Sequence, residues 1–282
     1  MKNKYSFLYK IKIRLNFLYI MPKKWPWLIW VFSSAEERMG ERSFWLLHKL
    51  KQIDWNKKEN FFVWKNIKIY YDQLFSPVLF DVFFTNYNLP KDILETDRSY
   101  ETDYVYISKQ DVVIDAGANI GLFSFLAAIK TSNKIYAFEP FSDAVSYIKK
   151  TKEVNNLNNI NIIELALGKR NEEKTFLVTE NSLERTACLG KEGKKKKVSV
   201  VKLDTWVKDN NILKIDFIKA DIEGMERDFL QGAKETIKKF KPKLSLCTYH
   251  FPNDPEVLEK IILDINPEYN IFQNDKKIYA WV

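Results

Sequence analysis

The chain has 282 residues, enough to bury a sizeable core, and its 46% apolar and 29% charged side chains are typical of globular proteins, not disordered ones. Lysine and arginine exceed aspartate and glutamate by 45 − 37 = 8, which permits anionic partners without requiring them. Two cysteines and two histidines exclude a disulfide framework and argue against a zinc site, so we expect a cytoplasmic protein.

The N-terminal region differs in composition from the rest. Residues 1–32 are basic and aromatic, but lysines and prolines interrupt the apolar runs before they reach the roughly 20 residues that span a bilayer. The segment could pack on its own domain or on a partner subunit in an oligomer, or lie peripherally on an anionic membrane. We expect an aromatic-rich α/β extension over 1–95, acting as a lid, substrate platform or interface, and a second domain over 96–282.

The second domain opens on a strand, a glycine loop and a helix. Val112 to Ile114 is a β-branched run too short for a helix, and small residues follow it up to Gly121. The apolar run Leu122 to Ile129 then predicts a helix. Gly117 and Gly121 would let the backbone approach a ligand, and the new helix would present unpaired N–H groups to an anion.

The charge of this loop indicates its ligand. A dinucleotide site has the spacing Gly-x-Gly-x-x-Gly and directs its helix at a pyrophosphate. Here the spacing is Gly-x-x-x-Gly, and Asp115 at the strand end would repel a pyrophosphate. S-adenosylmethionine has no phosphate, carries an ammonium and a sulfonium, and has a carboxylate that a helix N-terminus can hold. This ligand fits the loop better.

A second acidic residue follows the next strand. Lys134 to Phe138 predicts that strand, which ends at Glu139, 24 residues beyond Asp115. The spacing is close to the roughly 20 residues expected of an acid that accepts both ribose hydroxyls. The glycine loop and Glu139 together predict a nucleoside-binding βαβ unit.

A hairpin and a short helix are expected next. Phe176 to Val178 and Val198 to Lys202 predict two strands joined by a loop with five lysines, Lys191 and Lys194 to Lys197. Such a run is usually solvated, although it could contact an acidic glycan or nucleic acid. Leu203 to Lys208 predicts a helix capped by Asp204.

Two more acids follow a central strand within residues 215–226. Asp221 and Glu223 should emerge at its carboxyl end, the edge at which open α/β sheets bind ligands. Neighbouring buried carboxylates are costly unless a cation or hydrogen bonds hold them. The alternative is that they cap the helix expected from Met225 to Lys239. Lys219 is expected to pair with one of these acids.

A histidine follows the next predicted strand, Lys243 to Thr248. His250 should therefore reach the same edge of the sheet. With an unperturbed pKa near ~6.5 it suits a general base. A purely structural histidine is the alternative.

Six blocks in this order resemble the FkbM-type S-adenosylmethionine-dependent methyltransferases, and the resemblance runs from about Tyr100 to His250. The blocks are Val-Ile-Asp-Ala-Gly-Ala-Asn-Ile-Gly (113–121), Phe-Glu-Pro (138–140), Ala-Leu-Gly (166–168), Lys-Leu-Asp (202–204), Ile-Lys-Ala-Asp-Ile-Glu-Gly-Met-Glu (218–226) and Tyr-His (249–250). The resemblance implies an α/β fold with a Rossmann-like class I methyltransferase sheet, mostly parallel with an antiparallel last strand, and helices on both faces.

The residues and the resemblance together give a set of expected site residues. The expected cofactor-binding residues are Glu101, Asp115, Gly117, Ala118, Asn119, Gly121, Glu139 and Leu167. Asp221 is expected near the methyl donor, and His250 is the candidate base. Leu167 could instead be ordinary turn packing, and Glu101 a solvated loop charge. A divalent metal held by Asp221 and Glu223 is a further option, but the favoured site contains no metal.

The expected activity is O-methylation of a hydroxyl on a sugar, a glycan or a small metabolite. Three alternatives stay open. A nucleic-acid methyltransferase would use the positive charge, although the chain shows neither an amino-methylation motif nor an RNA-binding module. A nicotinamide-dependent reductase is opposed by Asp115 and the glycine spacing. A non-catalytic binding protein could have kept the fold.

Overall fold

A computed structural model of the chain describes residues 54–56, 59–64, 66–71, 100–178 and 194–282. The chain divides into two compact units, 1–69 and 70–282. A small sheet is formed by β1 (Asp54–Asn56), β2 (Phe61–Trp64) and β3 (Ile67–Tyr70), and its first two strands are antiparallel. The expected domain boundary at residue 95 and the basic aromatic segment 1–32 lie outside the described residues.

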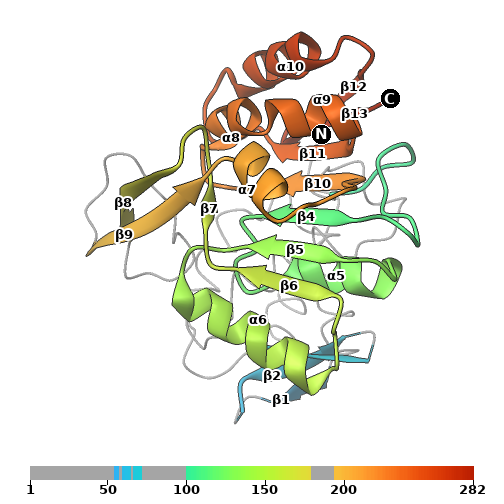
Figure 1. Cartoon of the computed structure of the whole chain (residues 1–282). Coiled ribbons are helices and arrows are strands. Elements are labelled where there is room, and N and C mark those ends of the chain that lie inside the picture. Colours follow the sequence, from blue (N-terminus) through green and yellow to red (C-terminus); the bar gives the residue numbers. More distant parts are fainter. Residues whose placement is uncertain (1–53, 57–58, 65, 72–99, 179–193) are drawn as a thin grey trace, which may run out of the picture. The chain divides into compact units, whose positions relative to one another are not determined.

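The second unit is built on a seven-stranded sheet. Its strands are β4 (Val113–Ala116), β5 (Ile135–Phe138), β6 (Ile160–Ile163), β10 (Phe217–Ala220), β11 (Lys243–Cys247), β12 (Asn270–Gln273) and β13 (Lys277–Trp281). Their order is β12-β13-β11-β10-β4-β5-β6 (Figure 1). The sheet is parallel except for β13, which is antiparallel to both β11 and β12. The predicted fold class is confirmed.

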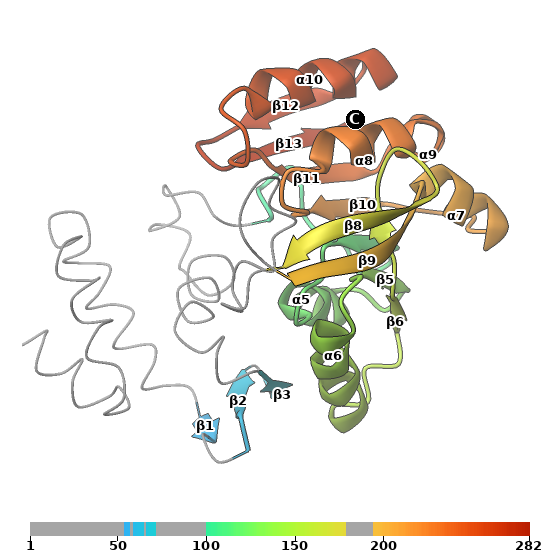
Figure 2. The same cartoon turned by 90° about the vertical axis from the view of Figure 1, so that its left-hand side faces the viewer.

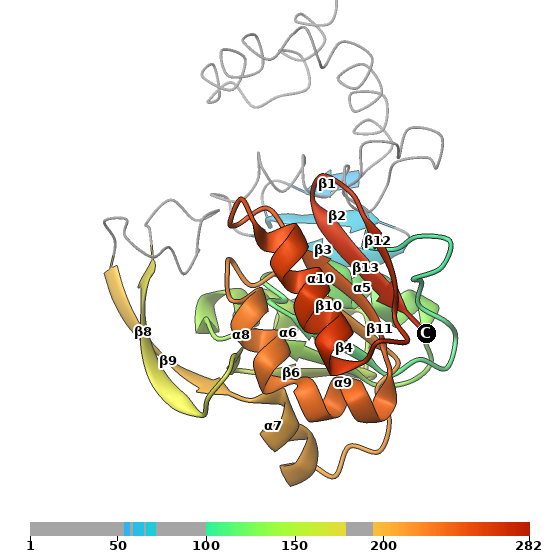
Figure 3. The ribbon, with the colours of Figure 1, turned by 90° about the horizontal axis from the view of Figure 1, so that it is seen from above.

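Helices cover both faces of this sheet. They are α5 (Leu122–Lys130), α6 (Ser142–Val154), α7 (Leu203–Asp209), α8 (Glu226–Gly232), α9 (Lys234–Phe240) and α10 (Asp254–Ile265). Because side chains alternate along a strand, Ile114 and Ala116 point into one core cluster with residues of α7 to α10, whereas Asp115 points to the opposite face, where Ser124 of α5 contacts it. α8 and α9 follow one another along the chain, and α10 packs against both (Figure 3). None of the helices in the described part of the chain is long and apolar enough to cross a membrane.

The hairpin forms as a separate small sheet. β8 (Glu172–Val178) and β9 (Lys194–Val201) are antiparallel (Figure 2). The short β7 (Ala166–Leu167) pairs with β9, so the sheet order is β7-β9-β8. The prediction of a loop is therefore wrong for Lys194 to Lys197, which lie within β9. Lys195 and Lys197 are exposed, while Val198 and Val200 are buried. Successive side chains of a strand point to opposite faces, so a strand with one buried face accounts for the exposed lysines and the buried valines.

Two helix predictions need correction. The helix expected from Met225 to Lys239 is divided at Ala233 into α8 and α9. Gly232, the last residue of α8, packs against the backbone of Gly168. A Cβ at Gly232 would lie 1.9 Å from the Gly168 carbonyl oxygen. Asp204 does not cap its own helix. Its carboxylate accepts the backbone N–H groups of Glu235 and Thr236, in the first turn of α9.

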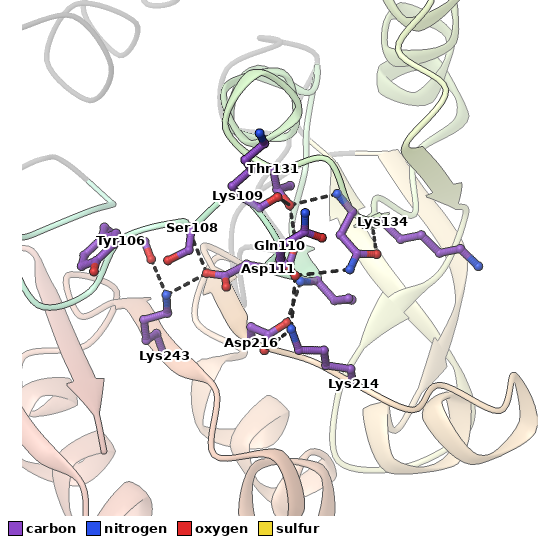
Figure 4. A network of polar contacts seen from close by, with 12 residues as sticks. Tyr106, Ser108, Lys109, Gln110, Asp111, Thr131, Lys134, Lys214, Asp216 and Lys243 are labelled. Carbon is purple, nitrogen blue, oxygen red and sulfur yellow. Dashed lines mark hydrogen bonds and ion pairs between the residues drawn. The ribbon is translucent and has the colours of Figure 1, made fainter.

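A polar network ties together the amino ends of the strands (Figure 4). The Asp111 carboxylate accepts the Ser108 N–H at 2.9 Å and the Lys243 ammonium at 2.7 Å, and Lys243 also donates to the Tyr106 carbonyl. Asp216 accepts the backbone N–H of Val112 at 2.7 Å. These contacts join the segment before β4 to the starts of β10 and β11, so they fix the register of the central strands.

We predict that Asp111→Asn lowers the free energy of unfolding by about 1–3 kcal/mol, because it weakens charged hydrogen bonds of a largely buried carboxylate. Urea denaturation of the purified chain measures the change. The control is Glu268→Gln, which removes an acid that pairs with Lys241 at the surface, and it should leave the midpoint unchanged. Equal midpoints for both variants would contradict the structural role of the network.

Candidate active site

The expected site residues meet at the carboxyl edge of the sheet. In the parallel register Ala116 lies beside both Phe138 and Ala220, so the residues that follow each strand emerge together. These are Gly117 after β4, Glu139 after β5 and Asp221 after β10, and His250 follows β11 closely. Figure 1 shows the arrowheads of β4 and β5 pointing toward the side on which β8 and β9 lie. This is the edge at which open α/β sheets bind ligands.

The glycine loop is held by the neighbouring strands. The N–H groups of Gly117 and Ala118 both donate to the Phe138 carbonyl, at 3.0 and 2.9 Å. Gly117 has φ +75°, and a Cβ there would lie 2.0 Å from the Asp221 carbonyl oxygen. The chain's own backbone therefore requires this glycine, whereas we had expected the approach of a ligand to require it. Gly121, with φ +90°, precedes the first turn of α5.

Glu139 is the acid placed best for a ribose. Its side chain is buried, and its two oxygens accept the backbone N–H groups of Asn119 at 2.8 Å and Phe141 at 3.0 Å. Burial raises the pKa of Glu139 to about 7, although both hydrogen bonds act in the opposite direction. A carboxylate can accept about four hydrogen bonds, so the two oxygens keep capacity for ribose hydroxyls.

Asp115 is satisfied from within the protein. Its side chain is fully buried, and it accepts hydrogen bonds from the Lys219 ammonium at 2.9 Å and the Ser124 hydroxyl at 2.6 Å. The expected pairing of Lys219 with an acid is present, and the acid is Asp115. Because this ion pair neutralises the carboxylate, the geometry favours an indirect role for Asp115 over direct contact with a cationic ligand.

Asp221 is a partly exposed, ionised carboxylate at the carboxyl edge of the sheet. Its side chain is 21% exposed, and it accepts hydrogen bonds from the hydroxyls of Tyr100 at 2.6 Å and Tyr249 at 2.9 Å. Burial alone would raise the pKa of Asp221, but the Lys219 ammonium and the Tyr100 hydrogen bond bring it below its usual value. Tyr100 and Tyr249 are not among the site residues expected from the sequence. Both adjoin predicted site residues, but nothing in their spacing shows that their hydroxyls converge.

His250 lies among three carboxylates. Its Nε2 is 3.2 Å from Glu223 and 4.0 Å from Asp221, and its Nδ1 is 3.3 Å from Glu226. Burial lowers the pKa of His250, but hydrogen bonding to Glu223 and Glu226 and the negative charges of Glu226 and Asp221 outweigh it and raise the pKa to about 10. Near neutral pH the imidazole already holds its proton, so the structure does not favour the expected general base.

Glu226 shapes the turn that presents these groups. It is buried, and its oxygens accept the N–H groups of Ile222 at 2.9 Å and Gly224 at 3.0 Å. Glu223 within the turn has φ 58° and Gly224 has φ 93°. The alternative in which Asp221 or Glu223 caps the following helix is wrong, because α8 has no side-chain cap, and Glu226 closes the loop in front of it.

Two groups in the described part of the chain have donor atoms close enough to hold a metal ion. They are Asp221, Glu223 and His250, and Glu226, His250 and Asp254, with all donor atoms of a group within 4.8 Å of one another. Both groups share His250. The first group contains Asp221 and Glu223, the two acids named above for a divalent metal, and that option stays a prediction.

Two expected cofactor residues have other partners. Leu167 is buried in β7 and belongs to the core cluster that includes Trp206. Glu101 accepts the Ile107 N–H at 2.8 Å and pairs with Lys130, the last residue of α5. The geometry favours packing for Leu167 and a structural contact for Glu101, and their roles at a cofactor stay predictions.

Known proteins resemble this chain in sequence and in structure. The chain is 25% identical over 158 residues to Methyltransferase 1 of Beauveria bassiana (strain ARSEF 2860), covering 48% of this chain and 63% of the relative. The structure of Methyltransferase FkbM from Methylobacillus flagellatus KT has a TM-score of 0.48 and 20% identity, covering 75% of this chain and 56% of that chain. A Streptococcus mutans protein solved in complex with SAH has a TM-score of 0.40 and 13% identity, covering 68% of this chain and 99% of that chain. The sequence model of the methyltransferase FkbM domain matches residues 115–269, more than half of the chain, and the chain therefore belongs to the FkbM methyltransferase domain family.

Proposed function

We propose that this protein transfers the methyl group of S-adenosylmethionine to a hydroxyl oxygen of a sugar, a glycan or a small metabolite. The observation that carries the proposal is the convergence of Glu139 and Asp221 on either side of the glycine loop, at the carboxyl ends of β5 and β10. One acid suits ribose hydroxyls, and the other suits a positively charged sulfonium.

The described residues fit this cofactor better than a dinucleotide. Asp221 is ionised and partly exposed at the edge, where it would attract a sulfonium and repel a pyrophosphate. The first turn of α5 offers backbone N–H groups to the cofactor's carboxylate. Asp115 is neutralised within the protein, so in this proposal Asp221 supplies the negative charge toward the sulfonium.

Methyl transfer is a displacement in line with the leaving sulfur. The donor is already activated, so the protein acts mainly by holding the acceptor oxygen near the methyl carbon, an effect worth up to ~7–11 kcal/mol. The acceptor hydroxyl must also lose its proton. Asp221, which is ionised and partly exposed, can take up that proton as the methyl group arrives and release it to water, and Glu223, with its side chain 38% exposed, can accept a hydrogen bond from a neighbouring hydroxyl.

The pKa of Glu139 predicts a pH dependence of cofactor binding. Above about pH 7 the ionised carboxylate accepts ribose hydrogen bonds, whereas below it the protonated group has lost part of that capacity. Between about pH 8 and about pH 6 the affinity for S-adenosylhomocysteine should fall about tenfold, in step with the ionised fraction. Calorimetric titration measures it. Glu139→Gln should bind more weakly with no such dependence, and an unchanged pH slope in that variant would refute the assignment.

Asp221 should distinguish the charged cofactor from its neutral-sulfur product. Asp221→Asn is expected to weaken binding of S-adenosylmethionine about tenfold more than binding of S-adenosylhomocysteine, because only the former carries the sulfonium charge. The two dissociation constants are measured for each variant. Asp216→Asn, before the opposite end of the same strand, is the matched control and should leave their ratio unchanged. Equal losses for both ligands in Asp221→Asn would count against the proposal.

The protonated state of His250 predicts the pH profile of methyl transfer. Mass spectrometry of metabolites and glycans first identifies an acceptor whose mass rises by one methylene unit. With that acceptor, the rate of methyl transfer should show no His250-dependent increase with pH centred near ~6.5. His250→Gln should lower the rate by a similar factor across that range. A midpoint near ~6.5 in the wild type that His250→Gln abolishes would restore the general-base role.

A further inference from the structure

Lys219 has a position that its place in the sequence does not reveal. It lies on β10, is buried, and its ammonium donates to Asp115 Oδ1 at 2.9 Å, to the Gly117 carbonyl at 2.7 Å and to the Ala116 carbonyl at 3.2 Å. An ammonium has three N–H groups, so these three oxygens use its full donor capacity. One side chain from β10 thus holds the end of β4 and the first residue of the glycine loop.

The carbonyl contacts bear on the conformation of the loop. The Gly117 carbonyl is held by Lys219, while the Gly117 N–H is held by the Phe138 carbonyl, so both polar groups of this residue are fixed from opposite sides. Gly117 also has a positive φ, which a glycine adopts about as readily as a negative one, so contacts such as these select the conformation. The following residues lead directly into α5, so the direction of its first N–H groups depends on this residue.

Lys219 also separates the roles of two acids. Its ion pair with Asp115 removes that negative charge from the pocket, and the Tyr100 ring, 5.4 Å from the ammonium, belongs to the residue whose hydroxyl holds Asp221. The Lys219 side chain is 4% exposed and that of Asp115 is fully buried. A buried pair of this kind adds little stability compared with well-packed apolar residues, so stability alone does not account for it.

We propose that Lys219 is a positioning residue for the cofactor: it fixes the Ala116 and Gly117 carbonyls, and through them sets the loop and the start of α5 that receive S-adenosylmethionine. The inference rests on the proposed function, since it assumes the same ligand. A purely structural lysine would affect the stability of the fold but not the affinity of folded protein for the cofactor. The two possibilities can therefore be separated.

The experiment titrates S-adenosylhomocysteine into the full chain and into three variants, and records the unfolding midpoint of each. Lys219→Met should weaken binding about 10- to 100-fold, the range expected for losing charged hydrogen bonds. The double variant Lys219→Met with Asp115→Asn removes both buried charges, so it should regain much of the stability but not the affinity. Lys214→Met removes a lysine from a surface pair with Asp216 just before the same strand, and it should behave as the wild type.

Near-wild-type affinity in the double variant would overturn the inference, because Lys219 would then serve only to neutralise Asp115. The same conclusion follows if folded Lys219→Met binds as tightly as the wild type. If Lys219→Met does not fold, the double variant alone decides between the two roles. Failure of the wild-type chain to bind S-adenosylhomocysteine is a different result, since it would overturn the proposed function itself.

Discussion

The buried ion pair between Lys219 and Asp115 is the interaction on which the carboxyl edge depends. It joins β10 to β4, the two central strands of the sheet, directly beneath the residues that follow these strands at the carboxyl edge. The carbonyl of Gly117 is held by the same ammonium, and a Cβ at Gly117 would collide with the backbone of Asp221. The glycine loop and the Asp221 turn are therefore fixed against each other, and neither could keep its conformation if the other moved.

This arrangement gives three acids of the edge three different environments. Asp115 is neutralised by Lys219, Glu139 accepts two backbone N–H groups in a buried position that raises its pKa to about 7, and Asp221 stays ionised between two tyrosine hydroxyls. Environment, and not residue type, thus determines which carboxylate can meet a sulfonium and which can meet a ribose. The family assignment and these environments point to the same cofactor, and the acceptor is the part of the reaction that the family does not specify.

The sequence predicts the parts of the fold that depend on local pattern. β4, the glycine loop, α5 and β5 follow from β-branched runs and glycines, and parallel order then brings Glu139 and Asp221 to one edge. Contacts between distant residues could not be predicted in this way. The Tyr100 hydroxyl meets Asp221 across 121 positions, and Lys219 meets the Gly117 carbonyl across 102. His250 was expected to have an ordinary pKa because nothing in its own strand shows that acids from the turn before α8 surround it.

The most direct test of the account is a calorimetric competition on the full chain between S-adenosylmethionine and a nicotinamide dinucleotide. We expect saturable binding of S-adenosylmethionine, one molecule per chain, and no measurable heat from the dinucleotide, since ionised Asp221 disfavours a pyrophosphate. Saturable binding of the dinucleotide without binding of S-adenosylmethionine would contradict the assignment of this edge.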